Sequence, residues 1–119
     1  MSYDRINSYA KINLALNVIG KKSKLHKIET LVAFLDLFDE ILIKKIVSKK
    51  NDISFSGKFS KDINRNNTVY KLFHFLEKKK ILGNQKFQIK IKKLIPTESG
   101  LGGGSMNAAS ILRYLIKKK

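Results

Sequence analysis

The most informative segment of the chain reads Pro96-Thr97-Glu98-Ser99-Gly100-Leu101-Gly102-Gly103-Gly104-Ser105. Four of five consecutive residues in it are glycine, the residue that loses the most conformational freedom on folding. Such a run is favoured where a backbone must approach a ligand closely. An alternating strand pattern ends at Lys92, and helical spacing begins at about Ser105. The segment is therefore expected to bring backbone N–H groups to a helix N-terminus, where an anion such as phosphate is stabilised.

Two common phosphate-binding patterns do not fit this segment. No Gly-Lys-Ser/Thr follows the glycines, as a P-loop requires, and the run does not follow the first strand as a dinucleotide-binding motif does. Ser105 is placed to cap the helix, to contact a phosphate or to help hold a magnesium ion. A glycine loop without any ligand remains the alternative that the run alone leaves open.

Outward from this segment, the sequence predicts a mixture of strands and helices. Alternating apolar residues predict strands at 7–18, 40–47, 53–56 and 87–92, with a further apolar stretch at 28–35. Residues 36–39 are expected to form a bend. A helix is predicted from about Asn67 to a stop at Gly83, and a second one from about Ser105. Because strands and helices do not alternate strictly, the fold class is α+β.

The composition limits the classes of protein to consider. The chain has 119 residues and a formal net charge of +16. It contains no cysteine, which excludes disulfides and thiolate metal sites. No apolar run is long enough to span a membrane, so a cytoplasmic protein is expected. The positive charge is mostly lysine, scattered at the ends of predicted elements and accompanied by isoleucine and asparagine. We interpret this as a compositional bias, and a basic nucleic-acid-binding module remains the alternative.

Several motifs together resemble a known family. The glycine run, with Pro96 before it and Asn107-Ala108-Ala109 after it, resembles the phosphate loop of the GHMP kinases, which include galactokinase, homoserine kinase and mevalonate kinase. Further segments resemble that family in the same order, namely Tyr9-Ala10-Lys11-Ile12-Asn13-Leu14, His26-Lys27-Ile28-Glu29-Thr30-Leu31, Leu35-Asp36-Leu37-Phe38-Asp39-Glu40 and Asn67-Thr68-Val69. These matches span residues 9–109, so the resemblance covers nearly the whole chain.

The resemblance implies a fold and a set of site residues. The fold is the GHMP kinase N-terminal domain, which is similar to domain 2 of ribosomal protein S5. Lys11 is implied as catalytic, near the acceptor hydroxyl, and Asn13 and His26 as substrate-binding. Asn67 is implied to lie near the nucleotide, although an N-cap role explains it equally well. ATP is expected to contact Pro96, Thr97, Glu98, Ser99, Gly100, Leu101, Gly102, Gly103, Gly104, Ser105 and Met106, with magnesium at Ser105.

Within the family, the triple glycine and Asn107-Ala108-Ala109 most resemble a member that phosphorylates cytidine diphosphate methylerythritol for isoprenoid precursor synthesis. Two positions depart from its pattern: Leu25 stands where a tyrosine is usual, and Met106 where a serine is usual. No acidic residue follows Asn107, although the family places its catalytic aspartate beyond this point. We therefore expect residues 1–119 to be an incomplete N-terminal ATP-binding domain without its C-terminal domain. Such a chain would be inactive alone, or a nucleotide-binding remnant without catalysis.

Overall fold

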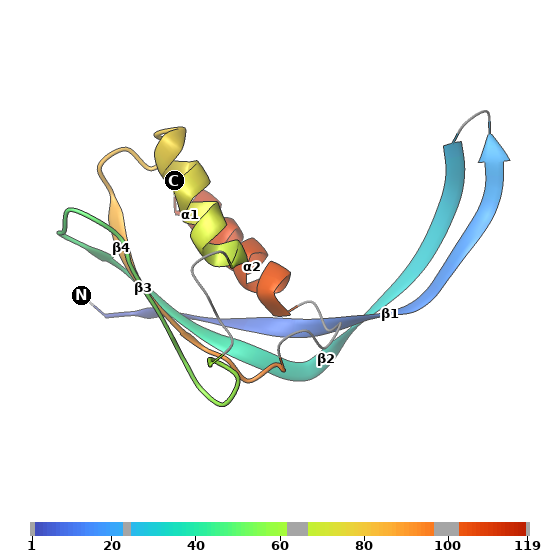
Figure 1. The fold of residues 1–119 in the computed structure, drawn as a ribbon, viewed down its shortest axis with the longest axis horizontal. Helices are drawn as coiled ribbons and strands as arrows, with labels where there is room; N and C mark the ends of the chain where they lie inside the picture. The colour runs from blue at the N-terminus through green and yellow to red at the C-terminus, as the bar shows by residue number, and fades with distance from the viewer. Residues whose placement is uncertain (1, 23–24, 62–66, 97–102, 119) are drawn as a thin grey trace.

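The computed structural model describes residues 2–22, 25–61, 67–96 and 103–118, with the backbone alone for residues 12–35. Its elements are β1 (Asp4–Lys22), β2 (Leu25–Ile46), β3 (Asp52–Ser56), α1 (Thr68–Lys78), β4 (Lys86–Lys92) and α2 (Gly103–Lys117). The strands form one sheet in the order β1-β2-β4-β3. Both helices lie side by side on one face of it (Figure 1). This architecture confirms the predicted α+β class.

The sheet is mixed. β2 pairs antiparallel with both β1 and β4, whereas β3 pairs parallel with β4, with Ile53 opposite Ile89. A parallel pair needs a crossover connection, and α1 lies in the chain between β3 and β4. The two-layer arrangement therefore follows from the order of the elements in the sequence.

The bend predicted at residues 36–39 is wrong, because β2 runs through these residues as one strand. The ladder is nevertheless irregular there. Pairing passes from Tyr9 opposite Phe38 to Lys11 opposite Phe34, so β1 advances by two residues while β2 advances by four. Extra residues on one strand of a pair bend that strand locally, as in a β-bulge. The sequence pattern thus located an irregularity but assigned it to the wrong kind of structure.

β1 and β2 continue well past the helices as a two-stranded ribbon (Figure 1), ending where Lys22 pairs with Leu25. We call residues 12–35 the hairpin arm and the remaining described residues the layered body. The radius of gyration is 16.7 Å, whereas a compact chain of this length is expected at about 13.5 Å. The arm accounts for this excess, since it carries the backbone away from the body.

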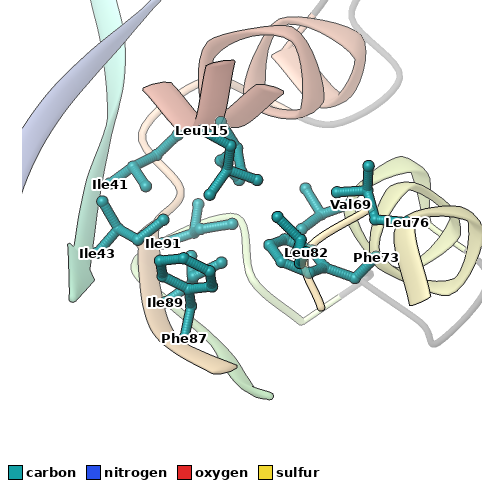
Figure 2. Close-up of a cluster of buried hydrophobic side chains, with 11 residues drawn as sticks. Ile41, Ile43, Val69, Phe73, Leu76, Leu82, Phe87, Ile89, Ile91 and Leu115 are labelled. Atoms are coloured by element: carbon teal, nitrogen blue, oxygen red, sulfur yellow. The ribbon is translucent and has the colours of Figure 1, made fainter. Parts of the chain in front are cut away.

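The hydrophobic core lies between the sheet and the two helices (Figure 2). Strand alternation turns Phe87, Ile89 and Ile91 of β4 inward. The other members of the cluster come from β2, α1, α2 and the segment after α1: Ile41, Ile43, Val69, Phe73, Leu76, Leu82, Ile111 and Leu115. Burying a large apolar side chain contributes about 1.5–3 kcal/mol, so this cluster holds the helices on the sheet.

Helix α1 begins where the sequence predicted and ends earlier. The side chain of Asn67 accepts hydrogen bonds from the backbone N–H groups of Val69 (3.0 Å) and Tyr70 (3.2 Å), which confirms it as the N-cap. The helix ends at Lys78 rather than continuing to Gly83. Lys80 adopts a positive φ of 55° just beyond the end. Over the described ranges, neither helix is long and apolar enough to cross a membrane.

Candidate functional site

The glycine-rich connection joins the end of β4 to the start of α2. Thr97, Glu98, Ser99, Gly100, Leu101 and Gly102 lie outside the described residues, so their predicted ATP contacts stay predictions. Pro96, half-buried, marks the upstream end of the connection. The downstream end is the first turn of α2, which contains Gly103, Gly104, Ser105 and Met106. The helix therefore starts two residues before the predicted Ser105.

The N-termini of both helices meet at this end of the connection. A Cβ atom placed on Gly104 would lie 3.6 Å from the hydroxyl oxygen of Thr68, the first residue of α1. Neither helix has an acidic residue in its first turn. Each helix N-terminus carries a partial positive charge of about half an elementary charge. Two such ends side by side favour an anion at this position.

A buried polar cluster, which we call the Asp39 cluster, lies next to the end of β4 and the start of α2: Ser8, Asp39, Lys93, Asn107 and Ser110. Its central members are almost fully enclosed, since Asp39 is 0%, Asn107 1% and Lys93 2% exposed. They come from β2, from α2 and from the residue that follows β4. No buried polar side-chain atom of the described residues lacks a hydrogen-bond partner. A buried charge pair of this kind is tolerated only when its hydrogen bonds are complete.

The carboxylate of Asp39 is the centre of this network. Its Oδ2 atom accepts from the Lys93 ammonium at 2.5 Å and from the Asn107 amide at 3.0 Å. The Oδ1 atom accepts from the backbone N–H groups of Leu94 (2.6 Å) and Ile95 (2.9 Å). Asn107 in turn accepts from Lys93 at 2.8 Å and donates to Ser8 at 3.0 Å. One side chain of β2 thus contacts both flanks of the glycine-rich connection.

The backbone of Lys93 is fixed as well. Its N–H donates to the carbonyl of Ser56 at 2.7 Å, which extends the β3–β4 pairing by one bond. Gly57 packs against the same peptide with a φ of +94°, and a Cβ atom there would come within 2.7 Å of the Lys93 carbonyl oxygen. Only glycine accommodates both this φ and this approach. The exit of β4 is therefore held at the backbone and at the side chain.

The residues predicted to bind substrate lie on β1 and β2. Lys11 is half-buried and pairs with Phe34, and Asn13 pairs with Val32 within the same regular stretch. The structure therefore brings these two positions together on one strand. His26 pairs with Lys21 near the end of the hairpin arm. Lys21 lies eight residues beyond Asn13 on β1, which corresponds to about 26 Å of extended strand. The side chains of Asn13 and His26 lie outside the description, so their roles stay predictions.

The sequence interpretation missed Asp39 and Lys93 as site residues, although a signal was present. Asp39 is spaced by two and four residues from Ile41 and Ile43, and Lys93 by two and four from Ile91 and Ile89, all of which are buried. Period-two alternation places all of these side chains on the core face. A charged residue at such a position is expected to be paired, because an unpaired buried charge is very costly. Two inward charges of opposite sign are therefore expected to form an ion pair, an inference that the sequence interpretation did not make.

The described residues contain no group of three or more histidine and acidic side chains that would hold a metal ion. The predicted magnesium ligand, Ser105, is exposed in the first turn of α2. A lone hydroxyl does not hold magnesium by itself. The ion usually takes phosphate oxygens and waters for most of its shell, so one hydroxyl beside a bound triphosphate fits its chemistry.

Comparison with known proteins identifies relatives of this chain. The model of the GHMP kinases N terminal domain matches residues 67–118. A 4-diphosphocytidyl-2-C-methyl-D-erythritol kinase of Pelagibacter ubique is 56% identical over 119 residues, covering 100% of this chain and 42% of that protein. The kinase of the same name from Anaplasma marginale is 40% identical over 119 residues, covering 98% of this chain and 40% of its own length.

Two solved structures share the fold. A crystal structure of 4-(cytidine 5'-diphospho)-2C-methyl-D-erythritol kinase aligns with a TM-score of 0.69 and 27% identity, covering 96% of this chain and 40% of that one. Homoserine kinase from Cytophaga hutchinsonii aligns with a TM-score of 0.59 and 22% identity over 98% of this chain and 37% of its own, a likeness in fold. The chain thus spans about 40% of the length of these relatives.

Proposed function

Because this chain belongs to the GHMP kinases, we propose that it forms the N-terminal, nucleotide-binding part of an ATP-dependent small-molecule kinase. The observation that supports this most is the position of the glycine-rich connection. It follows β4 in the chain, and its described downstream end is the first turn of α2, which approaches the first turn of α1. Backbone N–H groups and two helix dipoles then stabilise the phosphates of the nucleotide without any basic side chain in the loop.

The proposed acceptor is 4-diphosphocytidyl-2-C-methyl-D-erythritol, as in the names of the relatives at 56% and 40% identity. The reaction would transfer the γ-phosphate of ATP to the 2-hydroxyl of the methylerythritol part. Lys11, on β1, would stabilise the negative charge that develops on the reacting oxygen and the phosphate. Asn13 would position the methylerythritol part, and His26 would bind the cytosine by hydrogen bonds.

ATP supplies the phosphoryl group, and magnesium would neutralise the charge on its phosphates. On the side of the protein, Gly103 and Gly104 leave room for the phosphates to approach the backbone of α2. Ser105, exposed in the same turn, offers a hydroxyl to a phosphate or to the metal. In this proposal the 119 residues bind nucleotide but do not turn over, because they contain no acidic residue beyond Asn107 to accept the proton of the hydroxyl.

A chimera tests this function directly. Residues 1–119 would replace the matching part of the Pelagibacter ubique relative, of whose length they cover 42% at 56% identity. We expect the purified chimera to convert ATP and the cytidine substrate to ADP and phosphorylated product, and residues 1–119 alone to bind ATP without turnover. A folded chimera that binds neither compound would contradict the proposal.

The matched variant is Lys11→Met in the chimera, since Lys11 is half-buried on a strand and methionine is an unbranched, uncharged side chain only one atom shorter. Loss of one stabilising charge at the reacting atoms is expected to lower kcat by about 10²–10³-fold, with ATP affinity unchanged. An unchanged kcat would remove Lys11 from the proposed catalytic residues.

Nothing in the comparisons favours the alternative of a nucleic-acid-binding module. Such a module would present aromatic rings for base stacking. Among the described aromatic residues, Phe73 and Phe87 are instead buried in the core, and Phe55 packs against Tyr70 with ring centroids 5.9 Å apart. A cytoplasmic location remains part of the proposal.

A further inference from the structure

The Asp39 cluster joins the two flanks of the glycine-rich connection through one carboxylate. On the upstream flank, Oδ1 of Asp39 accepts from the N–H groups of Leu94 and Ile95, the residues immediately before Pro96. On the downstream flank, Oδ2 accepts from Asn107 in the second turn of α2. Lys93 bridges the two sides, because its ammonium donates to both Asp39 and Asn107.

We propose that Asp39 and Asn107 are positioning residues that hold the exit of β4 and the N-terminal turns of α2 at a fixed separation, so that the first turn of α2 is held in place for a triphosphate. The role in triphosphate binding rests on the proposed function. The fixed separation between the end of β4 and the start of α2 does not. Neither side chain is itself placed to touch a ligand, since both are buried.

Stability alone is a weak reason for this cluster. Replacing a buried ion pair by well-packed apolar side chains is often neutral or stabilising. The surroundings here would allow such packing, because Ile41, Ile95 and Ile111 are fully buried nearby in the same layers. Hydrogen bonds, however, are directional, whereas apolar contacts permit sliding. A polar cluster therefore fits a requirement for a defined distance between two elements.

The downstream link can be cut without leaving an unpaired charge. Asn107→Leu keeps the approximate volume of the side chain and removes its bonds to Asp39, Lys93 and Ser8. The Asp39–Lys93 ion pair and the bonds to Leu94 and Ile95 stay intact. The matched control is Ile111→Ala, which weakens the packing of α2 one turn later but touches no member of the cluster by a hydrogen bond.

The first measurement is independent of nucleotide. The chain contains no cysteine, so spin labels can be attached at Lys92→Cys and Ala109→Cys, two exposed positions on either side of the connection. We expect a narrow distance distribution between the labels in the parent and in Ile111→Ala, and a clearly broadened one in Asn107→Leu, at a temperature where all are folded. Equal widths in Asn107→Leu and the parent, or equal broadening in Ile111→Ala, would overturn the proposal.

The second measurement is ATP affinity of the same chains. Only the fraction of molecules with a correctly spaced connection binds well, so the apparent Kd rises as that fraction falls. We expect about a 10-fold higher Kd for Asn107→Leu and a change below about 2-fold for Ile111→Ala. A parent chain that binds no ATP would refute the proposed function, while the label distances would still decide whether the cluster fixes the separation. ATP binding that is equal in all three would refute the role in nucleotide binding.

Discussion

The layered body and the hairpin arm are built from the same two long strands but differ in what supports them. In the body, β1 and β2 pair with further strands or lie under helices, and their inward side chains form the core and the Asp39 cluster. In the arm, the two strands pair with each other alone as a ribbon beyond the helices (Figure 1). Among the predicted ATP-binding residues, the described ones, Pro96 and residues 103–106, belong to the body, whereas both predicted substrate-binding residues, Asn13 and His26, belong to the arm.

This difference suggests a division of work. A triphosphate needs donors at fixed positions, which a body with a packed core supplies. An elongated cytidine substrate needs reach, and a two-stranded ribbon provides length with few residues, at about 3.3 Å per residue. An isolated two-stranded ribbon is only marginally stable in water. We therefore expect the arm to become better ordered when substrate, or the rest of a longer kinase, packs against it.

Removing the arm should have the largest effect among the variants that test the difference between arm and body. Replacing residues 13–32 by Asn-Gly would join Ile12 to Ala33, which already pair, through a two-residue hairpin turn. In the chimera described above, this change should abolish phosphorylation and substrate binding completely while leaving ATP affinity within about 3-fold, because the phosphate-binding end of α2 is untouched. The measurement is calorimetric titration with each compound separately.

The control for this deletion is a variant with the same turn placed further out, in which Asn-Gly replaces residues 19–27 between Val18 and Ile28, another existing pair. It removes His26 and keeps Asn13. We expect this shorter deletion to weaken substrate binding through the lost cytosine contact and to retain slow turnover. Loss of ATP binding in either variant would show that arm and body are not separable.

Lys93→Met should give the largest loss of stability within the body. It leaves the carboxylate of Asp39 buried without its cation, and removing one partner of a buried ion pair costs about 3–5 kcal/mol. A small domain is stable by only about 5–15 kcal/mol, so much of the variant should be unfolded at modest urea concentrations. Urea unfolding followed by circular dichroism measures the free energy of unfolding.

The matched control is Lys90→Met, on the same strand but on the outer face of the sheet. Lys90 is exposed, and its ammonium makes a cation–π contact with Tyr3, 5.1 Å from the centre of the ring. We expect a change within about 0.5 kcal/mol, as for most surface substitutions. Similar losses for both variants would mean that Lys93 contributes through general charge rather than through the buried pair.

The sequence predicted the parts of the molecule that obey a local period. Apolar alternation located β4 closely, and the spacing of Val69, Phe73 and Leu76 together with Asn67 located the start of α1. The glycine run follows β4 and leads into α2 as predicted, although Gly103 and Gly104 belong to the helix itself. Each of these signals depends on neighbours within a few residues of the chain, and a single sequence contains them completely.

The parts that the sequence did not predict depend on contacts between distant residues. The bend expected around Asp36 and Asp39 came from the turn propensity of aspartate, but antiparallel pairing with β1 overrides it. Asp39 lies 54 residues from Lys93 and 68 from Asn107 along the chain. A local sequence pattern does not identify such distant partners. The only signal for them was that both charged residues fall on the core face of their strands.

Asn67→Ala tests the body at the start of α1, with a smaller expected effect. The cap bonds to Val69 and Tyr70 would be lost, which typically costs about 1 kcal/mol. Asn84→Ala, at an exposed position between α1 and β4, is the control and should be nearly neutral. Urea unfolding measures both. A loss well above about 2 kcal/mol for Asn67→Ala would show that this side chain does more than cap the helix.

The smallest effect concerns the end of the body farthest along α2, where Tyr114 donates a hydrogen bond to Asp4 at 2.5 Å. Burial raises the pKa of Tyr114 to about 12, with further contributions from the hydrogen bond to Asp4 and from its charge. Lys118 also faces Asp4, at 3.7 Å, and lies over the ring of Tyr114. Because the pKa is about 10 in an unfolded chain, the folded form keeps the phenol proton at a pH where the unfolded form has lost it.

The sign of the pH effect follows from this. Below pH 10 the phenol is protonated in both states, so its stabilising contribution is complete; between pH 10 and 12 the unfolded state is favoured by ionisation and the contribution is lost. Tyr114→Phe should therefore be less stable than the parent by about 0.5 kcal/mol at pH 7, a modest value for a solvent-screened pair. The advantage of the parent should fall steadily as the pH rises from 10 to 12. The lysines titrate in both proteins, so the difference between two urea unfolding curves isolates Tyr114. A difference that stayed constant across this pH range would mean that its hydroxyl is not held by Asp4 in solution, and that the body is looser at this end than its core.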